Sequence, residues 1–256
     1  MNLLTLDIET SPHQADVWAL RDVNVGINQI RKSGGVLCWA AKWLDRPDDE
    51  VIYDSINQSS RKRMLQHIHS LLSDADAVVG FNSKAFDCKH LNREFLLQGM
   101  SPPPPYKHID LLTTMRRNFK FASNKLQYVS QALEIGEKTQ HQGHGLWSLC
   151  EQGDQDAWAL MGKYNRQDVL LTEKLYHRVL PWIGGQHPNR NNYDGAPEIR
   201  ACPSCGGTHL QQRGFARTIA QRYRRFQCLD CGTWTRTAFS ALNTREDRER
   251  ILRAAA

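Results

Sequence analysis

The chain has 256 residues, 40% hydrophobic and 23% charged, and this length and composition favour one full core plus a smaller module over a disordered chain. The longest uninterrupted apolar run, over residues 36–41, is far below the roughly 20 residues that cross a bilayer, and the first residues lack a basic signal segment, so we expect a soluble cytoplasmic protein. The formal charge of +6 lies entirely in residues 186–256, with 12 Arg, no Lys and 6 acidic residues, which indicates either a polyanion partner or a merely solvated basic surface.

The first 112 residues alternate between strand and helix signals. We predict five strands, over residues 3–9, 35–44, 50–55, 76–82 and 107–112. An amphipathic helix with a Ser cap is predicted over residues 59–75 and a second helix over 87–98, ended by a run of prolines. The most regular helical pattern covers residues 154–180, and we expect Pro181 to end it.

The composition changes at residue 184. The stretch GGQHPNRNNYDGAPE is rich in Gly, Pro and Asn, which is typical of a linker. We therefore predict a first domain over residues 1–183, a linker over 184–199 and a cysteine module over 200–240. The charged segment 241–256 is expected to form an exposed helix.

Acidic residues occur where apolar ones are expected. Asp7 and Glu9 are two apart on a core strand and point to one face. Asp168 lies four residues after Tyr164 on the apolar stripe of the long helix, and Asp87 follows the fourth strand. Buried carboxylates require a counter-charge, supplied either by a salt-bridge network or by hard cations such as Mg²⁺ or Mn²⁺. The spacing favours the cations.

Three motifs, D-I-E-T-S-P at 7–12, G-F-N-S-K-A-F-D at 80–87 and Y-N-R-Q-D at 164–168, resemble the exonuclease motifs of the DEDD superfamily. They match the subclass with a tyrosine four residues before the last aspartate; Lys163 stands where the sister subclass has histidine. With S-N-K-L-Q-Y-V at 123–129, they are most similar to the proofreading domains of family B DNA polymerases. The resemblance covers residues 1–183 and implies an α/β, RNase H-like fold, a mixed five-stranded sheet flanked by helices.

The same resemblance implies a role for each acidic residue. Asp7 would bridge two Mg²⁺ or Mn²⁺ ions, Glu9 and Asp168 would complete the shell of the first ion, and Asp87 would hold the second. Tyr164 would orient the attacking water. The expected reaction is two-metal hydrolysis of phosphodiester bonds from a 3′ end, with DNA as the expected substrate.

Neighbouring residues are candidates for substrate contact. Asn82 and Phe86 are expected either to touch the terminal nucleotide or to shape the strand-to-helix turn, Thr10 either to offer a polar contact or to belong to a turn, and Lys125 either to meet a phosphate or to be solvated. Two alternatives stay open: a 3′ exoribonuclease, and a non-catalytic nucleic-acid-binding or recruitment protein. Four costly carboxylates in one set speak against the second.

Two C-x-x-C pairs define the C-terminal module. We predict that Cys202, Cys205, Cys228 and Cys231 hold one structural Zn²⁺ in a small β-rich zinc ribbon, with disulfides as the alternative. Cys38, Cys88 and Cys150 are expected to be small buried residues.

Between the two cysteine pairs, cations and aromatic rings are interleaved. Arg222, Tyr223, Arg224 and Arg225 are candidates for phosphate contact and base stacking. Docking of a protein partner is the alternative use of this segment.

Overall fold

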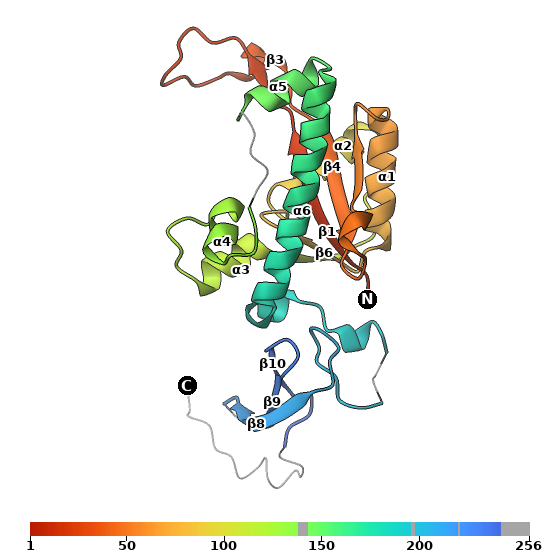
Figure 1. Ribbon diagram of the computed structural model, residues 1–256, viewed down its shortest axis with the longest axis vertical. Coiled ribbons are helices and arrows are strands. Elements are labelled where there is room, and N and C mark those ends of the chain that lie inside the picture. The colour runs from red at the N-terminus through yellow and green to blue at the C-terminus, as the bar shows by residue number, and fades with distance from the viewer. Residues whose placement is uncertain (138–142, 196–197, 220, 242–256) are drawn as a thin grey trace. The chain divides into compact units, whose positions relative to one another are not determined.

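The computed structural model describes residues 1–137, 143–195, 198–219 and 221–241 (Figure 1). The chain divides into two compact units, Asn2–Tyr176 and Met1 with His177–Ala256. Among the described residues, no helix combines the length and the apolar character that a membrane span requires.

The N-terminal unit is built on a mixed five-stranded sheet ordered β5-β4-β1-β6-β7. Its strands are β1 (Leu3–Thr10), β4 (Val36–Trp43), β5 (Ile52–Ser55), β6 (Ala77–Gly80) and β7 (Lys107–Asp110). Strand β1 pairs antiparallel with β4 and parallel with β6, so the antiparallel and parallel halves of the sheet meet at β1. The prediction of a mixed five-stranded sheet is confirmed.

Six helices accompany this sheet in the described part of the chain. They are α1 (Arg61–Asp74), α2 (Asp87–Leu97), α3 (Leu111–Asn118), α4 (Leu126–Ala132), α5 (Gly145–Glu151) and α6 (Gln155–Ile183). The Ser60 hydroxyl caps α1 by accepting from the Arg63 amide, and Asp110 caps α3 in the same way from Thr113.

The expectation that Pro181 ends the long helix is wrong, because α6 continues to Ile183. A proline inside a helix removes one backbone donor and crowds the carbonyl four residues earlier. Pro181 lies only two residues before the end of α6, where the helix has few further turns to lose. The ring is therefore tolerated in the last turn.

The two faces of β1 serve different purposes. Leu4, Leu6 and Ile8 point to the face where they pack with buried side chains of α1 and α2. The alternate residues, Asp7 and Glu9 among them, point to the opposite face, which α6 crosses in Figure 1. This opposite face carries the acidic residues beside a second apolar cluster, in which Cys38 of β4 packs with Trp158, Met161 and Tyr164 of α6.

A short two-stranded sheet, β2 (Gln14–Ala15) with β3 (Ile30–Lys32), was not foreseen. Strands of two and three residues are too short to show the alternation on which strand prediction depends.

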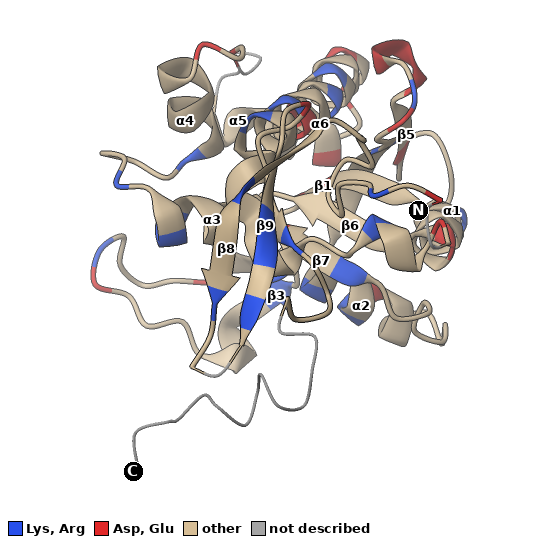
Figure 2. Ribbon diagram, turned by 90° about the horizontal axis from the view of Figure 1, so that it is seen from below, with Lys and Arg blue, Asp and Glu red and all other residues tan. Residues whose placement is uncertain are grey.

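The C-terminal unit contains a small antiparallel sheet ordered β10-β9-β8. Its strands are β8 (Leu210–Arg217), β9 (Arg222–Cys228) and β10 (Trp234–Arg236). Figure 2 shows basic residues along β9. The predicted small β-rich module with four cysteines is confirmed, whereas the predicted exposed helix over 241–256 lies outside the described residues apart from position 241.

Candidate active site and candidate metal centre

Three of the predicted acidic residues converge. The carboxylates of Asp7, Glu9 and Asp168 offer oxygen atoms that all lie within 4.8 Å of one another. Strand β1 supplies two of them through its period of two, and α6 supplies the third. The pairing of β1 with β4 shifts register between Glu9 and Thr10, and such a bulge re-aims the side chains beside it.

Two neutral donors fix the orientation of the β1 carboxylates. The Asn165 amide nitrogen donates to Asp7 Oδ2 over 2.6 Å and to the Asp7 carbonyl over 3.3 Å. The Trp147 indole nitrogen donates to Glu9 Oε2 over 2.9 Å. Sequence reasoning missed both residues. Asn165 follows Tyr164 within the third motif, which is a usable signal, but nothing local connects Trp147 with Glu9.

Tyr164 lies beside the acidic residues and is buried. Its ring meets that of Trp147 edge-on, with centroids 6.0 Å apart and planes at 78°. Burial raises the pKa of the Tyr164 hydroxyl, and the nearby negative charges of Asp168, Glu9 and Asp7 raise it further. The hydroxyl therefore stays protonated and able to donate at neutral pH.

A cavity of about 330 Å³ opens at this site. The described residues that line it are Asp7, Phe81, Lys125, Leu126, Gln127, Tyr164 and Asp168. Lys125, singled out as a candidate phosphate contact, thus shares a cavity with two of the acidic residues and the tyrosine. The cavity therefore brings together side chains of both charges.

Asp87 is placed differently from the other acidic residues. It is not part of the group of three, and its buried Oδ1 accepts from the Ile8 amide over 3.0 Å. Ile8 is the residue between Asp7 and Glu9. Burial raises the pKa of Asp87 to about 7, with the Ile8 amide opposing the rise and the charge of Asp110 adding to it.

Asn82 shapes the turn before α2. Its φ of 69° lies in the left-handed region, which asparagine tolerates better than most residues. The Asn82 amide donates to Asp110 Oδ1 over 3.2 Å, and its carbonyl accepts from the Phe86 amide over 3.0 Å. Phe86 is 38% exposed. The described residues that line the cavity do not include Asn82, Phe86 or Thr10. Their contact with substrate stays a prediction.

The acidic group fits hard divalent cations. Mg²⁺ and Mn²⁺ prefer oxygen ligands, and carboxylates this close together raise one another's pKa unless a cation intervenes. Asp7, Glu9 and Asp168 are the residues placed to hold such an ion.

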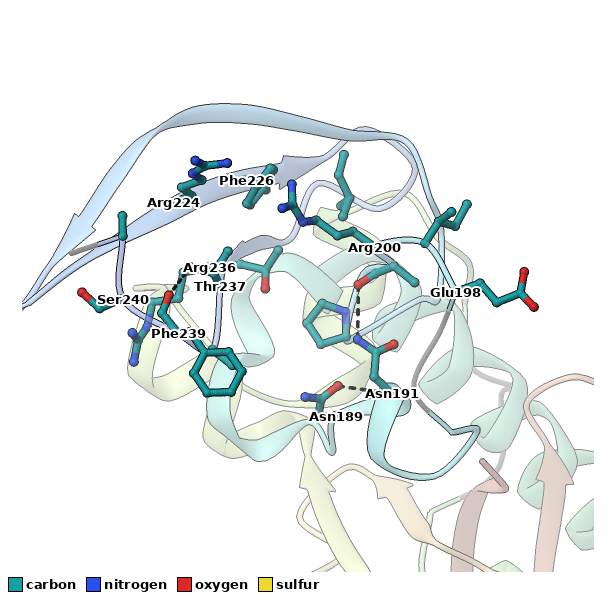
Figure 3. Close-up of a pocket in the computed structure, with 17 residues that line it drawn as sticks. Asn189, Asn191, Glu198, Arg200, Arg224, Phe226, Arg236, Thr237, Phe239 and Ser240 are labelled. Carbon is teal, nitrogen blue, oxygen red and sulfur yellow. Dashed lines mark hydrogen bonds between the residues drawn. The ribbon is translucent and has the colours of Figure 1, made fainter. Parts of the chain in front are cut away.

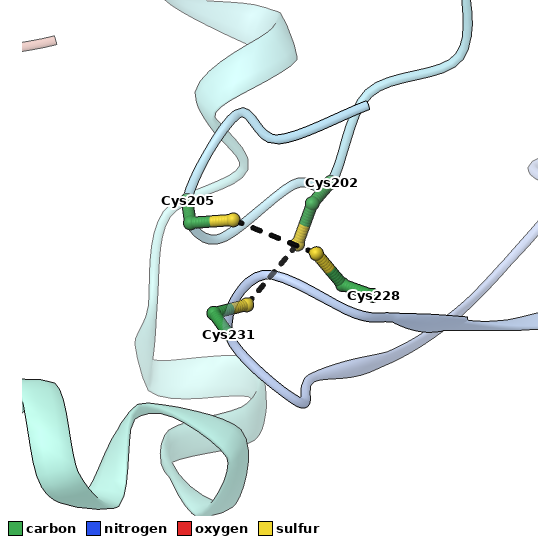
Figure 4. A group of neighbouring side chains, drawn as sticks. All are labelled: Cys202, Cys205, Cys228 and Cys231. Carbon is green, nitrogen blue, oxygen red and sulfur yellow. Dashed lines mark hydrogen bonds between the residues drawn. The ribbon is translucent and has the colours of Figure 1, made fainter. Parts of the chain in front are cut away.

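The four C-terminal cysteines also converge (Figure 4). The Sγ atoms of Cys202 and Cys231 lie 3.7 Å apart, as do those of Cys205 and Cys228. Metal–sulfur distances of about 2.3 Å in a tetrahedron give sulfur–sulfur edges of about 3.8 Å, so the cluster fits zinc. All seven cysteines are free, which contradicts the disulfide alternative, and the three outside the cluster are buried as expected.

Strand alternation separates the predicted nucleic-acid contacts of the ribbon. Arg222 and Arg224 point to one face of β9, and Tyr223 and Arg225 to the other. On the second face, the Arg236 guanidinium lies 3.7 Å from the centre of the Tyr223 ring. The basic run is therefore divided between two surfaces.

Comparison with known proteins gives the context of this fold. No curated protein matches the chain. A solved structure described as the family B DNA polymerase from the hyperthermophilic archaeon Pyrobaculum calidifontis is similar at 17% identity with a TM-score of 0.52, covering 70% of this chain and 24% of that one. This likeness concerns the fold, which is RNase H-like.

A family model also matches. It is described as RNase_H superfamily and covers residues 32–180. The matched range includes Asp87, Tyr164 and Asp168, while Asp7 and Glu9 precede it. Because the match extends over more than half of the chain, the protein belongs to the RNase H superfamily.

Proposed function

We propose that the protein is a divalent-metal-dependent 3′–5′ exonuclease of the DEDD type with a tyrosine, which hydrolyses phosphodiester bonds of DNA. The observation that carries this proposal is the convergence of Asp7, Glu9 and Asp168 beside Tyr164. The strand polarity, the tyrosine subclass and the preference for DNA over RNA follow from the motif resemblance. The likeness in fold to a DNA polymerase supports a nucleic-acid substrate.

Two divalent ions, once bound, would activate the attacking water and neutralise the leaving 3′ oxygen. Asp7, Glu9 and Asp168 would hold the first ion, and Asp87 would hold the second. Asn165 and Trp147 fix the orientation of the β1 carboxylates before any ion arrives, as partners behind metal ligands commonly do. The protonated Tyr164 hydroxyl would donate to the attacking water, and Lys125 would contact a phosphate.

We further propose the domain organisation that the sequence suggests. Residues 1–183 would form the nuclease, 184–199 a linker and 200–240 a zinc ribbon that aids binding of nucleic acid. Cys202, Cys205, Cys228 and Cys231 would hold a zinc ion whose purpose is structural, because a module of this size buries too little core to fold without help.

The proposal is tested with 5′-labelled single- and double-stranded DNA and RNA in Mg²⁺ or Mn²⁺. We expect a ladder that shortens from the 3′ end with the wild type and no cleavage with Asp7→Ala. Trp147→Phe removes the donor to Glu9 and keeps an aromatic ring, though a smaller one, beside Tyr164. The rate should fall by about tenfold, the lower part of the range for partners behind metal ligands. Asp49→Ala removes an exposed carboxylate outside the cavity and serves as the matched control.

Two outcomes would contradict the proposal. Binding of labelled strands without cleavage in any metal would favour the non-catalytic binding protein. Cleavage by Asp7→Ala at the rate of the Asp49→Ala control would remove Asp7 from the site.

A further inference from the structure

A second and larger cavity lies wholly within the C-terminal unit. Its volume is about 590 Å³, within the range of about 300–1,000 Å³ that is usual for small-ligand sites. Figure 3 shows its lining, which comes mainly from the segment before the first cysteine pair, from β9 and β10, and from the segment after β10. None of these residues belongs to the proposed catalytic group.

Arginine and an aromatic ring lie together on one wall. Arg224 and Phe226 project from the same face of β9, two residues apart. The Arg200 guanidinium lies 5.3 Å from the centre of the Phe226 ring. Both arginines are exposed while Phe226 is buried, so both charged groups are available to a ligand and the ring supports that of Arg200.

Phe239 adds an aromatic ring that is largely exposed to solvent. Its side chain is 87% exposed although it lines the cavity. A large aromatic ring left in water gains free energy when a flat partner stacks on it. Its backbone is fixed nearby, because the Thr237 hydroxyl donates to the Phe239 carbonyl over 2.8 Å.

The charge of the cavity points to an anion. Arg200 and Arg224 face it, and among its described lining residues Glu198 carries the only carboxylate. Arg236 also lines the cavity, but its guanidinium is engaged with the Tyr223 ring. The exposed side chains of Arg200 and Arg224, beside the exposed phenyl ring of Phe239, match a phosphate joined to a flat base.

We propose that this cavity binds one nucleotide of a single strand of nucleic acid, with its base stacked on Phe239 and its phosphate held by Arg224 and Arg200. The inference rests on the proposed function, since it assigns a second contact to the same substrate. Stacking on an aromatic ring tolerates any base, so the site would hold the strand without reading its sequence.

The test measures binding of a fluorescent single strand of about 12 nucleotides, within the usual range of single-strand sites, by full-length protein carrying Asp7→Ala to prevent cleavage. Phe239→Ala should weaken binding by about tenfold, the effect of losing one base stack, and leave the salt dependence unchanged. Arg224→Gln should reduce the slope of log affinity against log salt by about 0.7, the value for one lost phosphate contact.

Arg213→Gln is the matched control. It removes the same charge from an exposed position on β8 outside the cavity. The design also uses a set of single strands, each of which lacks the base at one position, with a different position in each strand. The loss caused by the best-placed abasic site in the wild type should disappear in Phe239→Ala, because the two changes remove the same stack. Unchanged zinc content shows that each variant is folded.

The outcomes separate the two proposals. If the wild type cleaves nucleic acid while Phe239→Ala and Arg224→Gln bind like Arg213→Gln, the nucleotide site is wrong, the nuclease stands and a protein partner becomes the better occupant. If the protein neither binds nor cleaves any strand, the proposed function fails and the nucleotide site fails with it.

Discussion

The carboxyl group of Asp87 has an unfavourable position for an acid. It is only 4% exposed, and Asp110 lies close enough to raise its pKa. Below about pH 4 the group is protonated in both the folded and the unfolded chain. As the pH rises from about 4 to about 7, the unfolded chain releases this proton while the folded chain keeps it. The contribution of Asp87 to the free energy of unfolding therefore falls over that interval.

This predicts an unusual result for Asp87→Asn, which keeps the shape and removes the ionisation. In Mg²⁺-free buffer, the variant should melt higher than the wild type by on the order of a few °C at about pH 8, and the difference should shrink at about pH 5. At the same time the proposed exonuclease activity should be lost. Thermal unfolding at both pH values and the cleavage assay measure the two effects.

A lower melting temperature at both pH values would show that the Asp87 carboxylate stabilises the fold. Asp87 would then be a structural residue that happens to lie near the site.

At the level of residues, the sequence was sufficient to predict which side chains share a face, because local spacing determines this. Asp7 and Glu9 share a face because strands have a period of two, and Tyr164 and Asp168 share one because helices have a period near four. The role of Trp147 could not be predicted, because its hydrogen bond to Glu9 joins residues that are 138 apart in the chain. The same alternation rule could have predicted that the basic run divides between two faces of a strand, with Arg222 and Arg224 on one and Tyr223 and Arg225 on the other.

Among the elements, α6 and β4 are joined by a buried ion pair. Lys42 Nζ lies 2.8 and 2.7 Å from the two carboxylate oxygens of Glu173, and the lysine side chain is 1% exposed. Lys42 lies on the same face of the sheet as Asp7, since Asp7 pairs with Ala40 two residues away. The pair therefore fixes α6 against the face that carries the site.

We predict that Lys42→Met destabilises the fold by about 3–5 kcal/mol, because it leaves a buried carboxylate without its cation. The double variant Lys42→Met with Glu173→Leu should recover most of this loss, since a well-packed apolar pair often replaces a buried ion pair at no cost. Urea unfolding of the two variants and the wild type measures the difference. A double variant as unstable as the single one would mean that α6 depends on the charges themselves.

Elements with a long regular pattern were predictable, and short ones were not. The five sheet strands and α6 follow from runs of apolar residues, whereas β2 and β3 together have only five residues. The end of α6 was misplaced because a proline in a last turn costs less than one in a helix interior.

At the scale of the whole molecule, the chain combines two units with different sources of stability. The N-terminal unit has an extensive apolar core on one side of its sheet and a second apolar cluster built from residues of β4, α5 and α6. The described part of residues 200–240 has few buried side chains, Cys202, Phe226 and Cys228 among them, so we expect the metal to supply most of the stability of this module.

Cys228→Ser should therefore abolish zinc binding, unfold the C-terminal unit and leave the N-terminal unit folded. Binding of single strands should weaken and its salt dependence become shallower, because the arginines lose their arrangement. Zinc content, thermal unfolding and binding titrations measure these effects, with Ser204→Ala as a control within the same knuckle. Unchanged binding after loss of zinc would assign all nucleic-acid contacts to the N-terminal unit.

Strand β9 also limits how this protein can change over evolution. Its alternate residues Arg224, Phe226 and Cys228 line one face, and the last of them belongs to the cysteine cluster. Inserting or deleting a single residue before Cys228 would move Arg224 and Phe226 to the opposite face while the thiol stayed with its partners. The length of β9 is therefore expected to stay constant among descendants that keep the cavity.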